Sequence, residues 1–350
     1  MLSFILFIFI LGVIVLVHEF GHYLFAKIFK VYVYEFSIGM GKRLWYYKKK
    51  GGETEYSIRL IPLGGFCSLA GEEVDEADAK RIPKNRRLQD KKVWQRFLIM
   101  FAGAGFNFVL AFVLLFVSAL IFGSVTTKPV LGSVPEGLPA YEAGLRVGDT
   151  ILEVDGDKVS AWDDVMWDIQ MSDGSTLTFV VEDVDGNEKT VNVTPDKEET
   201  EDGTVTYKFG LGLDTTPQYG LGVSFQYAIN KTGSLFRIMF ETLKSLFTGQ
   251  VGVTDLSGPV GIYSVVDSQA KAGVDSILYL IAFLSLNVGV INLIPLPAFD
   301  GGRILFLIIE KIKGSPVSSR VENTIHNIGF LLLIGLMILV TFSDIFKLFN

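Results

Sequence analysis

The sequence predicts an α-helical polytopic membrane protein with four transmembrane helices, a β region on the cytoplasmic side and an inserted α+β domain. Two observations support this fold class. The 350 residues are 49% hydrophobic, with a mean hydropathy of +0.41, which is above the value of a typical soluble domain. Four apolar segments are long enough to cross a bilayer, and a polar, acidic stretch separates the second from the third.

Cysteine content and charge narrow the possible classes of function. Cys67 is the single cysteine, which excludes an intrachain disulfide and a metal site built on paired cysteines. A metal held by this chain must therefore use His, Asp or Glu. The net charge of −7 conceals an asymmetry, since residues 124–275 hold 24 acidic and 10 basic residues. The sequence carries no basic footprint typical of nucleic-acid binding.

The first predicted span, residues 1–30, carries an HExxH motif formed by His18, Glu19 and His22. In a helix the two histidines lie on one face, so both rings can bind one ion with Glu19 beside them. Zinc binds neutral imidazole and keeps a position for water, and the neighbouring carboxylate can accept that water's proton. The alternative is a set of ordinary polar residues at a helix end, but ionisable groups inside a bilayer are costly and usually functional.

The charges around this span predict its orientation. Residues 1–17 carry no charge, whereas Lys27 and Lys30 follow the apolar run. Because basic residues accumulate on the cytoplasmic side, the N-terminus is expected outside and the next loop in the cytoplasm. The HExxH motif is then expected in the inner half of the bilayer. A cleaved signal peptide is not expected, because no basic residues precede the apolar run.

Residues 31–93 change to a strand-like period of two, in which Tyr56, Ile58 and Leu60 alternate with polar residues. The segment 50–53 contains two glycines and predicts a two-residue turn. We expect a membrane-associated β-hairpin or small sheet on the cytoplasmic side, followed by a charged loop from Glu72 to Lys92. A plain solvated loop is the alternative. The edge of such a sheet could bind an extended peptide.

The second predicted span, residues 94–124, falls mostly in a stretch that carries no charge from 97 to 127. The run from Ala102 to Gly105 consists of small residues, which allow helix backbones to approach closely. Asn107 follows this run. Its amide is expected either to pack against a neighbouring helix or to contact a substrate.

Residues 126–214 are polar, turn-rich and acidic, and they are expected to form one small α+β domain on the outer face. Strand-like runs occupy 150–154, 176–181 and 190–193. The segment 143–156 resembles the signature of bacterial PDZ domains. The resemblance implies a PDZ-like domain that either binds peptide termini by strand addition or only filters access.

Residues 234–250 are expected to form an amphipathic helix in the outer interface. Arg237, Glu241 and Lys244 recur there at helical spacing among apolar residues. Such a helix could act as a ramp or gate toward the site, or it could only anchor the chain.

The third predicted span, residues 276–302, is interrupted near its end. Pro295 and Pro297 each remove a backbone donor, so the helix must break where protein or water can satisfy the freed carbonyls. Asp300 follows this break. The fourth predicted span is residues 324–345.

A catalytic zinc site needs a third protein ligand, and Asp300 and His326 are the two suitable residues expected at the depth of the HExxH motif. The third span runs from outside to inside, so Asp300 reaches the inner half of the bilayer. The broken helix gives a reason for a carboxylate at this depth, whereas His326 begins a helix and is typical of an interfacial residue. Asp300 is therefore the predicted ligand.

The HExxH helix, the segment from Asn292 to Gly302 and the PDZ-like insert together resemble the site-2 protease family, specifically the bacterial branch of the regulator-of-sigma-E protease. The resemblance covers nearly the whole chain and implies an intramembrane zinc endopeptidase. It also implies that Asn292 handles the substrate backbone. The residues that match the family's zinc ligands and catalytic base are His18, His22, Asp300 and Glu19.

The predicted reaction is hydrolysis of a peptide bond in the membrane segment of a single-span protein, such as an anti-sigma factor, a signal-peptide remnant or a peptide precursor. The bond must first become extended, and each freed backbone group costs several kcal/mol in lipid. Asn292 and the broken backbone around Pro295 are expected to bind these groups, with Asn107 as a further candidate. The alternatives are a membrane zinc transporter or sensor, for which no internal repeat is visible, and a non-catalytic PDZ scaffold.

Overall fold

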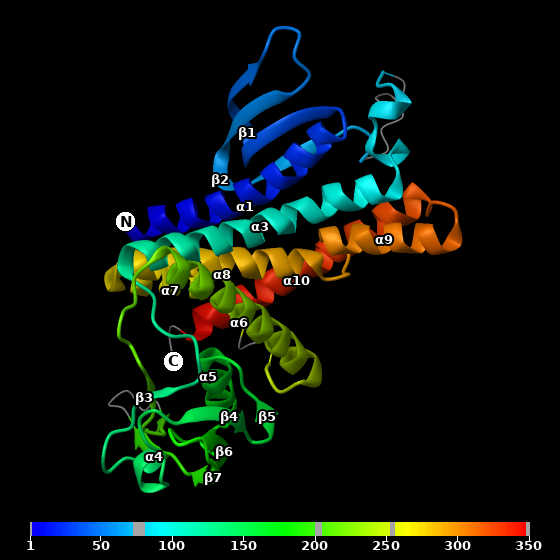
Figure 1. Ribbon diagram of the computed structural model, residues 1–350. Coiled ribbons are helices and arrows are strands. Elements are labelled where there is room, and N and C mark those ends of the chain that lie inside the picture. Colours follow the sequence, from blue (N-terminus) through cyan, green and yellow to red (C-terminus); the bar gives the residue numbers. More distant parts are fainter. Residues whose placement is uncertain (1, 73–80, 200–204, 253–255, 348–350) are drawn as a thin grey trace. The chain divides into compact units, whose positions relative to one another are not determined.

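The computed structural model describes residues 2–72, 81–199, 205–252 and 256–347 (Figure 1). The chain divides into two compact units, one made of Met1–Leu114 with Thr248–Asn350 and the other of Leu115–Phe247. Among the described residues, four helices are long and apolar enough to cross a membrane, in agreement with the predicted polytopic fold. They are α1 (Leu2–Ile28), α3 (Val93–Phe122), α8 (Val274–Leu293) and α10 (Ser319–Lys347).

The core of the first unit forms where α1 packs against α8 and against α7 (Pro259–Ala272). Ile10 and Ile14 of α1 are completely buried and lie one helical turn apart, so they present one apolar face to both neighbours. Asp344 of α10 is also buried, and its Oδ2 accepts a hydrogen bond of 2.8 Å from the amide of Gly261. A carboxylate at the amino end of α7 satisfies a free backbone donor and so ties α10 to α7.

The predicted hairpin is present as the antiparallel strands β1 (Val33–Lys48) and β2 (Glu55–Leu69). Its connection is longer than the predicted two-residue turn, because pairing ends at Lys48 and Glu55 and leaves residues 49–54 outside the strands. Glycine is unfavourable in strands and readily adopts positive φ. The two glycines therefore end the pairing of β1 with β2 early, in addition to allowing the chain to turn. Residues 73–80 of the predicted charged loop lie outside the described residues.

Glu35 of β1 forms side-chain contacts with β2. Its carboxylate accepts hydrogen bonds from Ser57 at 2.5 Å and from Arg59 at 2.8 Å, both on β2. Burial opposes ionisation of Glu35, but these donors and the charges of Arg59 and Arg43 hold its pKa below the usual range. The charged group therefore links the two strands.

The second unit contains a four-stranded antiparallel sheet with the order β5-β4-β6-β7. The three strand-like runs of the sequence correspond to β4 (Thr150–Val154), β6 (Leu177–Glu182) and β7 (Glu188–Val193). Alternate residues such as Phe179 and Val181 are completely buried in one apolar core. The remaining elements are α4 (Pro139–Glu142), α5 (Trp162–Met171), β3 (Leu131–Ser133), β5 (Asp157–Lys158), β8 (Asp196–Glu199), β9 (Val205–Lys208) and β10 (Gly212–Leu213). Residues 200–204 of this predicted domain lie outside the described part of the chain.

The helix predicted at 234–250 is the second half of a longer helix, α6 (Leu221–Thr248). Its charges are not all directed to an interface. Lys231 contacts Asp163 of α5 at 2.7 Å, and Arg237 contacts Asp164 at 3.2 Å. The ion pairs hold α6 against the sheet domain of the same unit.

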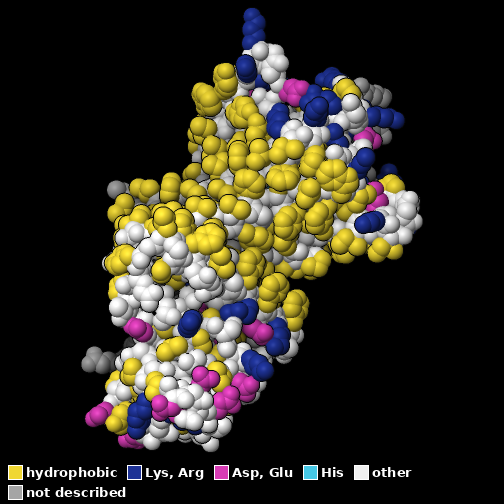
Figure 2. Space-filling model, viewed as in Figure 1, with side chains coloured by type: hydrophobic (Ala, Val, Ile, Leu, Met, Phe, Trp, Pro, Cys, Tyr) yellow, Lys and Arg dark blue, Asp and Glu magenta, His cyan; other side chains and the backbone are white. Residues whose placement is uncertain are grey.

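The third predicted span, 276–302, is not one continuous helix. Helix α8 ends at Leu293, residues 294–299 are non-helical, and α9 (Asp300–Lys313) follows. The break predicted at Pro295 is confirmed. Figure 2 shows hydrophobic side chains covering most of the helical surface of the first unit on the face drawn, as expected for helices that lie in lipid.

We expect Gly21→Ala to lower the melting temperature, although alanine favours helices by up to about 1 kcal/mol. A Cβ at Gly21 would overlap the carbonyl oxygen of Ala102 on α3, and such overpacking costs about 1–3 kcal/mol. Thermal unfolding of the metal-free protein in detergent measures the change. Gly335→Ala is the matched control, because a Cβ there meets no atom within 4 Å. A Gly21→Ala protein at least as stable as the Gly335→Ala protein would contradict this close contact.

Candidate metal centre

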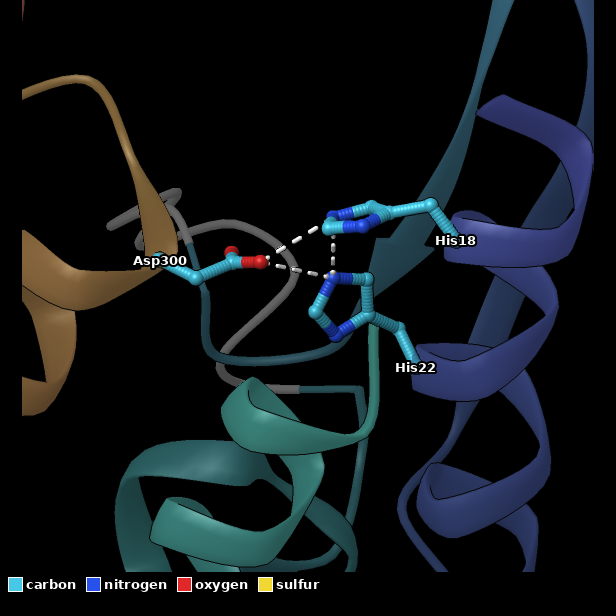
Figure 3. A group of neighbouring side chains, drawn as sticks. All are labelled: His18, His22 and Asp300. Carbon is cyan, nitrogen blue, oxygen red and sulfur yellow. Dashed lines mark hydrogen bonds and ion pairs between the residues drawn. The ribbon is translucent and has the colours of Figure 1, made fainter. Parts of the chain in front are cut away.

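The two histidines of the HExxH motif lie on one face of α1, as their spacing predicts. His18 and His22 are 7% and 8% exposed, and their Nε2 atoms are 3.2 Å apart (Figure 3). Both rings therefore turn the same nitrogen toward one point.

A backbone contact fixes the tautomer of His22. Its Nδ1 lies 2.8 Å from the carbonyl oxygen of Ile99 on α3, and a carbonyl can only accept a hydrogen. Nδ1 of His22 therefore carries the proton, and in the neutral ring Nε2 keeps a free lone pair. This arrangement is common for a histidine that binds a metal.

Small residues on α3 leave room for the two imidazoles. A Cβ at Gly103 would lie 2.7 Å from Cε1 of His22 and 2.8 Å from Cε1 of His18. Any side chain at this position would displace the rings. The sequence showed the run from Ala102 to Gly105 as a packing feature, but it did not show that Gly103 faces the histidines.

Asp300 reaches the same point because the chain breaks before it. After α8 ends, Ala298 adopts a φ of 77°, which is unusual for a residue other than glycine, and its amide donates to Nδ1 of His326 at 3.0 Å. A Cβ at Gly301 would overlap the carbonyl oxygens at the end of α8. The tight reversal thus needs glycine after Asp300, and it presents the carboxylate at the first position of α9.

His326, the other candidate for third ligand, supports this break instead. Its Nδ1 accepts the hydrogen bond from Ala298, and its ring lies 3.4 Å from the position that a Cβ of Gly302 would take. It is therefore used to hold the segment that carries Asp300.

The three predicted ligands form one cluster. Oδ2 of Asp300 is 3.1 Å from Nε2 of His18 and 3.1 Å from Nε2 of His22. Zinc with tetrahedral ligands at 2.0–2.1 Å requires ligand atoms separated by roughly 3.3 Å. Within the described residues, Oδ2 of Asp300 is buried without a hydrogen-bond donor, and these three residues are the group able to hold a metal ion. The donor set fits zinc.

Glu19 lies beside this cluster. It is half-buried, and its Cγ is 3.7 Å from the position that a Cβ of Gly65 on β2 would take. The hairpin therefore passes close to the carboxylate that follows His18. Arg303, one turn after Asp300 on α9, pairs with Glu72 just beyond the end of β2, which links the hairpin to α9.

Asn107 is buried and therefore closed to a substrate in this structure. It is completely buried, its Nδ2 lies 3.4 Å from Nδ1 of His18, and its backbone oxygen accepts a hydrogen bond from Ser285 at 3.0 Å. Its Oδ1 has no partner among the described residues. The two ends of an amide are nearly indistinguishable, and rotating the group lets Oδ1 accept a hydrogen from Nδ1 of His18.

Asn292 and Pro295 lie near the break but outside the cluster of ligand atoms. Nδ2 of Asn292 donates to the carbonyl oxygen of Val288 at 3.0 Å, and the side chain is partly exposed. Pro295 is exposed in the non-helical segment. Both residues are accessible from outside the packed core, unlike Asn107.

Comparison with known proteins identifies the family. The model of peptidase family M50 matches residues 6–336. A Fusobacterium nucleatum protein is 38% identical over 360 residues and covers 100% of both chains. The zinc metalloprotease RasP of Shouchella clausii is 33% identical over 418 residues, with 98% of this chain and 99% of the relative covered. The regulator of sigma-W protease RasP of Bacillus subtilis is 32% identical over 418 residues, with 98% of each chain covered. This chain therefore belongs to peptidase family M50, the site-2 protease family of zinc metalloproteases.

Proposed function

We propose that this chain hydrolyses peptide bonds within the membrane segments of single-span proteins, with His18, His22 and Asp300 as zinc ligands and Glu19 as catalytic base. The observation that carries the proposal is the convergence of three buried ligand atoms, 3.1–3.2 Å apart, between helices that are long and apolar enough to cross a membrane. A zinc transporter would need ionisable groups along a path through the membrane, and a non-catalytic scaffold would need no ionisable group at this place. Neither alternative gives a reason for Glu19 beside the proposed ligands.

The side chains of the cluster have separate tasks in this mechanism. When bound, zinc supplies a Lewis acid that polarises the scissile carbonyl and lowers the pKa of the attacking water. Glu19 accepts the water's proton on a carboxylate oxygen and later donates it to the leaving amine nitrogen. The carbonyl oxygen of Ile99 keeps the ring of His22 in the tautomer whose Nε2 faces the ion.

We assign Asn107 a positioning role at His18 in place of substrate contact. Its complete burial and its contact with Nδ1 of His18 support this assignment. An amide oxygen that accepts the Nδ1 hydrogen leaves Nε2 free for the ion, as the carbonyl of Ile99 does for His22.

Asn292 and the backbone around Pro295 are the proposed contacts for the substrate backbone. A peptide bond inside a helix is protected by its own hydrogen bonds, and separating it in lipid frees groups that need new partners. The carbonyl groups of Pro295 and Pro297 in the non-helical segment 294–299, and the backbone of β2 around Gly65 near Glu19, are the proposed partners for these groups. An extended substrate could pair with them as an added strand.

The proposed substrates are anti-sigma factors, signal-peptide remnants or peptide precursors. The name of the Bacillus subtilis relative, a regulator of sigma-W protease, supports the first of these. We further propose that the N-terminus and the PDZ-like domain lie outside the cell, with the metal centre in the inner half of the bilayer. Lys27 in the last turn of α1 and Lys30 just after the helix support this orientation.

Replacing the proposed base tests the assignment directly. Glu19→Gln should reduce cleavage of a single-span substrate in liposomes by at least about 100-fold, because general base catalysis contributes about 10²–10⁴-fold. Zinc content, measured by plasma mass spectrometry, should stay at one ion per chain. Glu198→Gln changes an exposed glutamate and should cleave normally. Retained cleavage by the Glu19 variant would remove this residue from the mechanism.

Replacing the proposed third ligand should act on the metal itself. Losing an outer partner of a ligand already weakens metal binding about 10–100-fold, so Asp300→Asn should weaken zinc binding by more than about 100-fold. Competition with a chromogenic chelator measures the affinity. Asp275→Asn removes an exposed aspartate at the start of α8 and should leave zinc binding unchanged. Equal affinities in the two variants would exclude Asp300 as a ligand.

The role of Asn107 can be separated from substrate contact. Asn107→Ala should weaken zinc binding about 10–100-fold, because His18 loses the acceptor that orients it. Asn107→Asp should restore much of the affinity, since a carboxylate also accepts the Nδ1 hydrogen. Chelator competition and cleavage kinetics are measured on the same preparations. A higher KM with unchanged zinc affinity would instead favour a substrate contact.

A further inference from the structure

A basic cavity of about 650 Å³ lies at one end of α1, separate from the metal centre. All of its lining residues belong to the first unit. They come from the last turn of α1, the chain that follows it, the hairpin connection and the segment before α3. The lining residues are Lys27, Lys30, Val31, Glu53, Asn85, Arg86 and Lys91.

The cavity holds more positive than negative charge. Glu53 is its single acidic lining residue, and Arg86 already occupies both of its oxygens, at 2.7 Å for the Nη2 contact. Lys27 lies 3.8 Å from the same carboxylate. Among the described residues, no carboxylate lies within ion-pair distance of Lys30 or Lys91. The cavity lining therefore holds four cations and one carboxylate, and only two of the cations contact it.

The lysines at the cavity repel one another. Burial and the positive charges of Arg86 and Lys30 lower the pKa of Lys91. Lys91 donates a hydrogen bond of 2.6 Å to the carbonyl oxygen of Asn85, which is a neutral partner. Lys30 is held with a φ of 57° just after α1, a conformation that costs energy in a residue other than glycine or asparagine. An anion in the cavity would relieve this repulsion.

Apolar side chains lie next in the chain to the lysines that line the cavity. Phe29 follows α1 directly. Its ring meets the ring of Trp94 on α3 edge to face, with ring centroids 5.3 Å apart, and the ring centroid of Phe25 lies 6.1 Å from that of Phe29. Trp94 and Ile28 are 54% and 57% exposed. Tryptophan beside lysine at the end of a membrane helix is typical of the level of lipid headgroups. Figure 2 shows Lys and Arg side chains gathered beyond the end of the hydrophobic surface of this unit.

We propose that this cavity binds the phosphodiester headgroup of an anionic phospholipid, with the acyl chains against Ile28, Phe29 and Trp94. A phosphate is an anion of suitable size that can accept several hydrogen bonds from lysine and arginine at once. A free phosphate would use the cations but not the exposed side chains of Ile28 and Trp94. The combination of both surfaces therefore favours a lipid over a soluble anion.

The test compares a cavity variant with a charge-matched control in the full-length protein. Lys30→Asn with Lys91→Gln removes two cavity charges, and asparagine tolerates the positive φ at position 30. Lys48→Gln with Lys49→Gln removes two exposed charges near the hairpin turn. Native mass spectrometry from a neutral detergent measures apparent Kd for phosphatidylglycerol, for phosphatidylcholine and for inorganic phosphate.

We expect the cavity variant to bind phosphatidylglycerol about thirtyfold more weakly than the parent, because each basic residue near an anionic surface contributes about a factor of five. The control should bind like the parent, and phosphatidylcholine should bind weakly to all three proteins. An equal Kd for phosphatidylglycerol in the parent and the cavity variant would overturn the proposal. So would an equal loss in the control, or inorganic phosphate that binds the cavity as tightly as the lipid. Melting temperatures without lipid show whether each variant is folded.

Discussion

The metal centre depends on a break in a helix that would otherwise cross the membrane. Asp300 can approach two histidines on α1 only because α8 ends at Leu293 and the chain reverses before α9. Inside lipid, the free backbone groups of such a break need partners from the protein. His326 supplies one by accepting the amide hydrogen of Ala298, and the glycines after Asp300 allow the segment to pack against the end of α8. The break is therefore stabilised by residues outside the proposed ligand set.

Space and hydrogen bonding on α3 complete the centre. Gly103 leaves the volume that the two imidazoles occupy, and Gly21 allows α1 to lie close to Ala102. The carbonyl oxygen of Ile99 contacts Nδ1 of His22, and the side chain of Asn107 contacts Nδ1 of His18. Each histidine thus has one nitrogen held by α3 and the other turned toward Asp300. Helix α3 thus orients the proposed ligands, which α1 and the start of α9 provide.

The hairpin connects this centre to its surroundings. Gly65 of β2 lies near Glu19, and Glu72 pairs with Arg303 on the helix that begins at Asp300. The same strands start next to the basic cavity, where the hairpin connection contributes Glu53. A short sheet therefore borders both the proposed site of chemistry and the proposed site of lipid contact, although the two use different residues. Recognition at the proposed lipid site depends on positive charge, whereas metal binding at the proposed centre depends on the geometry of the ligands.

The sequence by itself predicted the long apolar helices, the hairpin, the break before Asp300 and the candidate ligands. Long charge-free runs predicted the four apolar helices, alternation predicted the hairpin, the spacing of His18 and His22 placed both rings on one helix face, and the prolines predicted the break before Asp300. These features follow from local geometry and hydrophobicity, which neighbouring residues in the chain specify.

Only the tertiary structure decided which distant residues surround the ligands. The position of Asn107 against His18 and the use of His326 at the break depend on how segments far apart in sequence pack. A buried amide has the same sequence signal whether it contacts a substrate or a histidine, because its partner lies about 90 residues away in the chain. The packing of α3 against α1 places the amide of Asn107 against His18.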